Sequence, residues 1–305
     1  HMERGRKLLA KARSLRMNET GKANSCRTKG LKRIARSISD PTAKPLLFVK
    51  RDKPSEDGGR IGQHTSEPTE VDAIVKRAWK KVYDGNVKDM AETVKTFFTK
   101  HISRIYKAPE YQVKEIDADM VYETFQCTPK SAGGMDGWQP RELALFSKMV
   151  CSYVATLFTT IEDGAQWPRS TRHAKVMYLE KEGGILGEVM SFRPLTISSP
   201  LYRRYATMRL RCMDGWVRCW MLPEMHAGVP GMGAVDAWYK VLADIEQLSM
   251  EAQSYCGAAA DIVKFCDHSI RKLLYLVPRC AGLPIKVLAA YNRHIEGVTV
   301  YDVLA

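Results

Sequence analysis

The sequence predicts a helix-rich α+β fold that follows a flexible, basic N-terminal arm. Several segments repeat apolar residues at helical spacing, while a few short apolar stretches are better explained as strands. These segments alternate irregularly and show no internal repeat, which favours α+β over a regular doubly wound sheet. The chain has 305 residues, of which 45% are hydrophobic, so it can bury a sizeable core.

The net charge of +13 lies almost entirely in the first 53 residues, which hold 16 Lys and Arg against four Asp and Glu. The rest of the chain is nearly balanced, with 31 against 30. Such an arm attracts polyanions, mainly without sequence preference. A solvated linker or a nuclear targeting signal has the same composition, so both alternatives stay open. The Gly- and Pro-containing stretch 50–69 is interpreted as a linker, and order is expected from about Val71.

The cysteines and the hydropathy pattern indicate in which cellular compartment the protein is expected. The eight cysteines include no CxxC pair and no zinc-type spacing, which is typical of a reduced, intracellular protein. No apolar run approaches the roughly 18 residues that cross a bilayer, so no membrane association is expected.

Helices are expected first in the ordered part. Apolar residues recur at helical spacing over 74–82 and again over 87–105. Asp117 is expected to cap a short third helix that ends near Phe125. Pro140 suits the first turn of a longer helix that continues to Gly164.

Strands and helices then alternate. Extended segments over 174–179 and 191–199 flank a Gly-containing turn and are expected to form a β hairpin. A buried strand is expected over 255–263, because this apolar run has no helical period, and a last strand over 297–303. Further helices are expected over 200–220, 236–250, 269–276 and 284–294.

Asp261 is the sharpest single candidate for chemistry. It lies near the end of the expected buried strand, where a carboxylate is costly unless it is paired or bound to a metal ion. Mg²⁺ prefers oxygen ligands and keeps positions for phosphates, so such an aspartate is a suitable half-site. From the residues alone, Asp261 can equally cap a turn, and Asp267 can cap the next helix.

Two cations are expected on the hairpin. Lys181 and Arg193 can there bind a triphosphate, the arginine in bidentate fashion. An ordinary surface hairpin with two charges is the more common structure with this pattern. The glycine-rich loop over 130–137 either joins two helices or lies near phosphates, but it is not a P-loop, since no G-K-[ST] follows it.

Taken in order, five segments resemble the fingers and palm of non-LTR (LINE-type) retrotransposon reverse transcriptases. They are K-S-A-G-G-M-D-G at 130–137, K-V-M-Y-L-E-K-E-G at 175–183 with S-F-R-P-L-T at 191–196, A-G-V-P-G-M-G-A-V-D-A at 227–237, D-I-V-K-F-C-D at 261–267 and G-L-P at 282–284. Each segment alone is unspecific, and their order carries the resemblance. Group II intron reverse transcriptases share much of the pattern.

The resemblance implies a right-hand polymerase, with a basic arm or linker over 1–70, fingers over 71–220 and the first part of the palm over 221–305. Its activity would be RNA-directed DNA synthesis, which adds deoxynucleotides to a DNA 3′ end by phosphoryl transfer with two Mg²⁺ ions. The implied partners are an RNA template, a DNA primer and deoxynucleoside triphosphates, and the implied location is the nucleus.

The resemblance also implies roles for single residues. Asp261 and the carbonyl of Ile262 would bind Mg²⁺. The incoming nucleotide would be contacted by Lys181, Arg193, Ile262, Phe265 and Cys266. The template would lie near Lys130, Ser131, Gly133, Asp136 and Gly137.

The sequence departs from the family at two important places. Cys266 stands where the family usually has a bulky aromatic residue that excludes the ribose 2′-OH, and Phe265 stands one position early. The second catalytic carboxylate pair of the family would follow Ala305, so the chain alone is expected not to polymerise, because one carboxylate cannot hold two Mg²⁺ ions. Two other hypotheses stay open: a degenerate relic that binds RNA without catalysis, and a structural protein with accidental motif matches.

Overall fold

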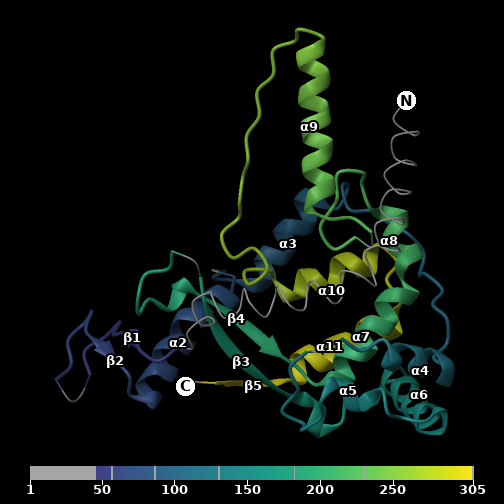
Figure 1. Ribbon diagram of the computed structural model, residues 1–305, viewed down its shortest axis with the longest axis horizontal. Coiled ribbons are helices and arrows are strands. Elements are labelled where there is room, and N and C mark those ends of the chain that lie inside the picture. The colour runs from purple at the N-terminus through teal and green to yellow at the C-terminus, as the bar shows by residue number, and fades with distance from the viewer. Residues whose placement is uncertain are drawn as a thin grey trace, which may run out of the picture. The chain divides into compact units, whose positions relative to one another are not determined.

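The computed structural model describes residues 46–55, 58–85, 87–129, 131–181, 183–229 and 231–303. The helix-rich α+β class is confirmed: in these ranges helices accompany small β sheets (Figure 1). The arm before Leu46 lies outside the described residues, and with it most of the predicted basic charge. The division into fingers over 71–220 and palm over 221–305 stays a prediction.

A two-stranded hairpin occupies part of the stretch whose composition indicated a linker. β1 (Val49–Lys50) pairs antiparallel with β2 (His64–Thr65). Leu46 and Val49 are buried in a core cluster together with residues of the first long helix. The Gly and Pro residues of this stretch therefore shape a connection between two strands. The described structure begins at Leu46, whereas the sequence predicted that order starts only at about Val71.

The first helices follow the predicted pattern. Asp117 caps its helix as expected, because its carboxylate accepts a hydrogen bond from the Met120 amide at 2.7 Å. No helix in the described ranges is long and apolar enough to cross a membrane. The helices that match the first three predicted ones are α2 (Pro68–Tyr83), α3 (Met90–His101) and α4 (Ala118–Gln126).

Two predicted long helices are each broken into two. Ser147 interrupts the first, because its hydroxyl accepts a hydrogen bond from the Val150 amide at 3.3 Å and starts a new helix. The second break falls at Met213. The resulting helices are α5 (Pro140–Leu143), α6 (Lys148–Glu162), α7 (Pro200–Cys212) and α8 (Asp214–Trp220).

A three-stranded mixed sheet has the strand order β4–β3–β5. β3 (His173–Glu180) and β4 (Phe192–Ile197) form the predicted antiparallel hairpin, in which Leu179 pairs with Arg193. β5 (Thr299–Asp302) confirms the last predicted strand and lies parallel to β3 on its other edge. The pairing of these two strands determines the position of the turn residues between them, which include Lys181.

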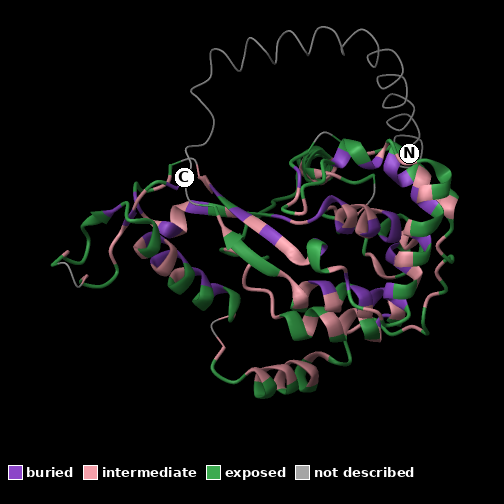
Figure 2. Cartoon of the chain, turned by 90° about the horizontal axis from the view of Figure 1, so that it is seen from below, coloured by how far each residue is buried: buried purple, intermediate pink, exposed green. Residues whose placement is uncertain are grey.

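The buried residues form two clusters. The first, called the helical core, joins α4, α6 and α7 with Trp167 and with Ala290 of α11 (Ile285–Gly297). The second, called the sheet core, packs Trp79 and other residues of α2 against Val176 and Tyr178 of β3. Figure 2 shows buried residues along the sheet and on the inward faces of the helices.

The buried strand predicted over 255–263 is wrong. These residues are irregular and exposed, with Ile262 65% and Val263 74% accessible. The segment returns from the end of α9 (Ala234–Met250) to α10 (Arg271–Cys280) without pairing to any described strand (Figure 1). A strand needs a hydrogen-bonded neighbour, so an apolar run without one does not form it.

Candidate anion-binding site

Lys181 directly follows β3 and begins the turn to β4. Its backbone amide donates to the Ser191 carbonyl at 2.9 Å, and its ammonium group donates to the Met190 carbonyl at 3.1 Å. The Gly184 amide donates back to the Lys181 carbonyl at 3.0 Å. These bonds close the turn and hold the Lys181 side chain against the residues that lead into β4.

Lys264 reaches the same place from far along the chain. The backbone around it is a run of turns, in which the Phe265 amide donates to the Ile262 carbonyl at 3.2 Å and the Asp267 amide to the Lys264 carbonyl at 3.0 Å. Lys264 itself has φ +52°, a left-handed conformation that non-glycine residues rarely adopt. Its ammonium group lies 4.0 Å from the centroid of the Trp79 ring, within the range of a cation–π interaction.

The two ammonium groups lie close enough to repel each other. Burial, first of all, and then the positive charge of Lys181 lower the pKa of Lys264 to about 8. The charge of Asp267 acts in the opposite direction. Among the described residues, neither ammonium group has a carboxylate at salt-bridge distance. Lys181 and Lys264, called the lysine pair below, thus form a partly buried positive site.

Helix α2 supplies the aromatic wall of the site. Trp79 is 2% exposed, and its ring centroid lies 5.6 Å from that of Tyr83 one turn later. Burial raises the pKa of the Tyr83 hydroxyl, and the charge of Asp267 raises it further, while Arg271 lowers it. Trp79 thus belongs to the sheet core while Tyr83 is exposed, and the charges that act on Tyr83 come from Asp267, from Asp302 of β5 and from Arg271 at the start of α10.

Arg193, the other predicted triphosphate contact, is placed differently. It pairs with Leu179, whereas Pro194 pairs with Tyr178. Because successive side chains of a strand point to opposite faces, Arg193 lies on the face of the sheet opposite to Tyr178 and to the sheet core. Its side chain is exposed. Arg193 is therefore an exposed residue on the outer face of the sheet, while Lys264 lies beside Lys181.

The glycine-rich loop is anchored to the start of α7, the helix that follows β4. The guanidinium group of Arg203 donates to the Ser131 hydroxyl at 3.1 Å and to the Ala132 carbonyl at 2.6 Å. Gly134 lies so close to α7 that an added Cβ would stand 2.8 Å from Cδ of Pro200 and 3.0 Å from Cα of Ser199. Two of the resemblance segments, the loop and the hairpin, are thus joined through one helix.

The predicted template contacts divide into exposed and structural residues. Ser131 and Gly137 are exposed, and Gly137 has φ +82°. Gly133 is buried beneath the Gln139 side chain, so it serves the packing of the loop. Asp136 accepts a hydrogen bond from the Trp138 amide at 3.3 Å and stabilises the turn. Lys130 lies outside the described residues.

Asp261, the predicted metal ligand, is exposed and stands in the irregular segment before the lysine pair. Phe265 and Cys266 are also exposed, and the Ile262 carbonyl accepts the turn hydrogen bond from Phe265. In the described part of the chain, no group of three or more His, Cys, Asp or Glu side chains could hold a metal ion. The residues described here therefore do not fit a two-Mg²⁺ centre, and Asp261 stays a predicted ligand.

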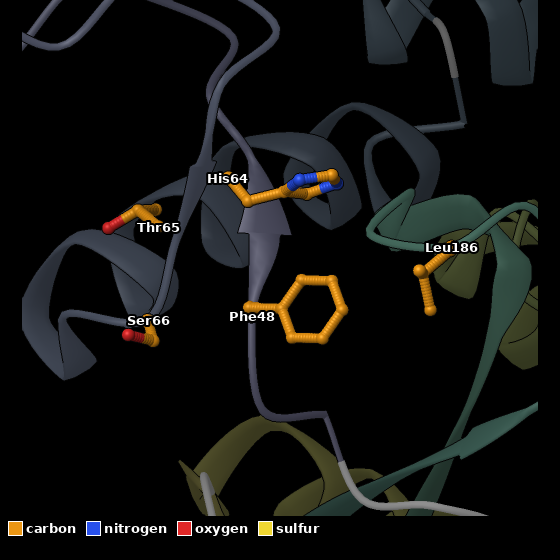
Figure 3. Close-up of a pocket in the computed structure, with 5 residues that line it drawn as sticks. All are labelled: Phe48, His64, Thr65, Ser66 and Leu186. Atoms are coloured by element: carbon orange, nitrogen blue, oxygen red, sulfur yellow. The ribbon is translucent and has the colours of Figure 1, made fainter.

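A shallow recess lies elsewhere, between the β1–β2 hairpin and the turn that follows Lys181. It has a volume of about 340 Å³ (Figure 3). The rings of Phe48 and His64 meet edge to face at 5.1 Å in its wall. Because its lining contains no carboxylate, Lys or Arg, the recess does not share the chemistry of the lysine pair. It is lined by Phe48, His64, Thr65, Ser66 and Leu186.

Sequence reasoning assigned no role to Lys264 or to Trp79. Lys264 stood inside one of the five segments, and Trp79 was one apolar position of a periodic helix. Their contact joins distant parts of the chain, and only the fold reveals it. No protein-family model matches the chain, and no curated protein matches it either.

Proposed function

We propose that this chain is part of an RNA-directed DNA polymerase in which the lysine pair binds the triphosphate of an incoming deoxynucleotide. The observation that carries the proposal is the proximity of Lys181 and Lys264. Lys181 belongs to the second reverse-transcriptase-like segment and Lys264 to the fourth. Mutual repulsion opposes their contact, so the fold holds two like charges together at a cost. Charges arranged in this way are typical of sites that bind the opposite charge.

The chemistry of the pair suits a phosphate chain. Ammonium groups bind phosphate oxygens as point charges, and a partly buried setting strengthens that attraction. The Trp79 ring packs against the Lys264 ammonium group and limits where it can lie. Phe265 and Cys266 follow Lys264 directly and are exposed, so a nucleoside attached to the phosphates would meet them.

The glycine-rich loop supports the template side of the proposal. Arg203 ties the loop to α7, and α7 follows the hairpin that carries Lys181. Ser131 and Gly137 remain accessible on this loop for a nucleic-acid backbone. On the same proposal Asp261, which is exposed just before Lys264, would supply one metal ligand of the polymerase.

The test is equilibrium binding of a fluorescent deoxynucleoside triphosphate to the full chain in the presence of a primed RNA template. Lys181→Ala should weaken binding at least about tenfold, the size of a lost charged hydrogen bond. Lys272→Ala is the matched control, since Lys272 is an exposed lysine of α10, and it should bind as the unmodified chain does.

Unchanged nucleotide binding in Lys181→Ala would overturn the proposal. Salt-dependent RNA binding without any nucleotide binding would also overturn it, and would favour the relic that retains RNA binding alone. If ribonucleotides bound as tightly as deoxynucleotides, triphosphate binding by the lysine pair would still be supported. The result would also show that Cys266 does not discriminate the sugar.

A further inference from the structure

We propose that the outer face of the β4–β3–β5 sheet binds single-stranded RNA, with a base stacked on Tyr301 and phosphates bound by Lys175 and Arg193. The outer face is the side of the sheet opposite to the sheet core and to helix α2. The location of this surface does not depend on the lysine pair. The choice of RNA as the strand rests on the proposed function.

The register of the three strands brings the residues of the outer face together. Met177 pairs with Leu195 across β3 and β4, and Lys175 pairs with Tyr301 across β3 and β5 (Figure 1). Arg193 precedes Leu195 by two residues on β4. Because paired residues and every second residue of a strand lie on the same face, all five side chains lie on one side of the sheet.

The middle of the outer face is apolar and open. Met177 is 37% exposed and its partner Leu195 is 48% exposed. A sheet face in contact with water normally carries polar side chains. Adjoining apolar side chains that remain accessible, with cations at their rim, are typical of a surface that a partner covers.

The charge on this face has one sign. Lys175 and Arg193 stand four pairs of residues apart at the two ends of the apolar middle, about 13 Å along the strands. Neither side chain has a hydrogen bond or an ion pair among the described residues. The two carboxylates of these strands, Glu180 and Asp302, pair with residues of the sheet core and so lie on the other face. The outer face is therefore complementary to a polyanion.

Tyr301 adds an aromatic surface beside Lys175. Its ring is 43% exposed, and its hydroxyl lies 3.2 Å from Nδ1 of His173. The two ring centroids are 5.7 Å apart, so the contact with His173 holds the Tyr301 ring in place. A single nucleic-acid strand alternates flat bases, which stack on such rings, with phosphates, which bind cations. An acidic protein surface would meet the cations but would offer no base for the ring.

The test compares two fluorescent oligonucleotides of about ten nucleotides, within the usual size of such sites. One is oligouridine, and the other is an abasic ribose strand with the same phosphates. The first Phe, Tyr or Trp of the chain is Phe48, so the basic arm should bind both strands equally through their phosphates. Fluorescence anisotropy with the full chain at about 0.2 M salt should show at least about tenfold tighter binding of oligouridine, because stacking needs a base.

Substitutions of Tyr301 separate its ring from its hydroxyl. Tyr301→Leu should abolish the preference for oligouridine over the abasic strand, since the stacking ring is gone. Tyr301→Phe should retain the preference, because it retains the ring. Tyr153→Leu is the matched control, since Tyr153 on α6 is 69% exposed, and it should bind as the unmodified chain does.

The two cations are tested by the salt dependence of oligouridine binding. Lys175→Gln and Arg193→Gln should each lower the slope of log affinity against log salt by about 0.7, the value for one phosphate contact of a single strand. Both positions accept polar side chains without loss of a contact, so these variants test the face even if Tyr301→Leu does not fold. Lys100→Gln is the control, since Lys100 is exposed on α3, and it should leave the slope unchanged.

Equal affinities of the unmodified chain for oligouridine and the abasic strand would overturn the inference and leave an acidic protein surface as the partner of this face. A preference that survives Tyr301→Leu, or salt slopes that neither cation changes, would overturn it as well. A preference found with deoxyuridine strands alone would overturn the choice of RNA.

The proposed function fails or stands separately. If oligouridine is preferred and Tyr301→Leu removes the preference, while Lys181→Ala leaves nucleotide binding unchanged, the inference holds and the proposed function fails. If Lys181→Ala weakens nucleotide binding but no preference for oligouridine exists, the proposed function holds and the inference fails.

Discussion

Arg209 and Glu162 form an ion pair inside the helical core, and their side chains are only 1% and 2% exposed. Two hydrogen bonds of 2.6 Å join the guanidinium group to both oxygens of the carboxylate. Tyr205 donates to the same carboxylate at 2.8 Å, and Arg209 also donates to the Lys114 carbonyl at 2.6 Å. The pair therefore links α6 to α7 with its polar groups well satisfied.

Removing one member of this pair should destabilise the chain strongly. Arg209→Met should lower the free energy of unfolding by about 3–5 kcal/mol, because it leaves the buried Glu162 carboxylate without its counter-ion. The double variant Arg209→Met, Glu162→Leu should recover much of the loss, since it leaves no uncompensated charge. Urea denaturation at pH 7 measures both.

An exposed ion pair provides the control for this prediction. Lys148 and Asp119 lie 2.7 Å apart with both side chains largely accessible. Asp119→Ala should cost less than about 1 kcal/mol, as exposed pairs usually do. A loss for Arg209→Met that is as small as this one would contradict the role assigned to the buried pair.

His294 should make the helical core sensitive to acid. Its ring is fully buried, stacks on Tyr202 with centroids 3.4 Å apart, and has no hydrogen-bond partner in the described chain for either nitrogen. Burial lowers its pKa from 6.5 to about 4, so the folded chain keeps the ring neutral where the unfolded chain protonates it. Stability should therefore fall as the pH drops from about 6.5 to about 4.

The size of this loss is on the order of 3 kcal/mol at pH 4, which follows from the pKa difference. Urea midpoints at pH 7, 5.5 and 4.5 measure it. His294→Phe keeps an aromatic ring against Tyr202 and Trp167 but cannot ionise. If this variant loses stability toward acid as steeply as the unmodified chain, carboxylates and not His294 cause the effect.

Asp302→Asn should stabilise the chain at neutral pH. Burial, and then the neighbouring carboxyl group of Asp72, raise the pKa of Asp302, while the Tyr178 hydroxyl donates to it at 2.8 Å and acts in the opposite direction. A carboxyl group whose pKa is raised on folding favours the folded state less as it ionises, so its ionised form is a cost at pH 7. Asparagine can still accept the Tyr178 hydrogen bond and carries no charge.

The melting temperature of Asp302→Asn should therefore exceed that of the unmodified chain at pH 7, and the gap should close as the pH falls toward 4. Asp244→Asn on α9 is the control, since Asp244 is exposed, and it should leave the melting temperature unchanged at both pH values. A lower melting temperature for Asp302→Asn at pH 7 would show that β5 needs the charge.

Gly134→Ala should loosen the glycine-rich loop from α7. The new methyl group would stand 2.8 Å from Cδ of Pro200 and 3.0 Å from backbone Cα of Ser199, and neither atom can turn aside. The expected cost is about 1–3 kcal/mol, as for other overpacked sites. Gly257→Ala is the matched control, because nothing lies within 4 Å of the added Cβ and its φ is ordinary. Equal unfolding midpoints for the two variants would contradict the close packing described here.

Local signals in the sequence predicted much of the fold. The cap at Asp117, the hairpin of β3 and β4, and the final strand β5 depend on neighbouring residues, so they could be predicted. The break at Ser147 could not, because the apolar spacing runs on across it. The strand over 255–263 was predicted wrongly, since the burial of a short apolar run depends on a distant partner.

In the candidate site, too, local features could be predicted from the sequence and contacts between distant segments could not. Lys181 was predicted on the hairpin turn and stands there. The proximity of Lys264 and the Trp79 ring depends on contacts between distant segments, and the face that carries Arg193 depends on the register of β4. Periodicity and motif spacing contain no information on such contacts, so only the fold identified the lysine pair.

The parallel pairing of β5 with β3 constrains how the chain can be made. Tyr178 and Asp302 meet across this pairing although 124 residues separate them. During synthesis the β3–β4 hairpin and the helical segments emerge first, while one edge of β3 keeps unpaired amides and carbonyls until β5 leaves the ribosome. An edge of this kind can be joined by strands of other chains. Closing so long a loop is also slow, so this nascent chain is exposed to misassembly until β5 has been made.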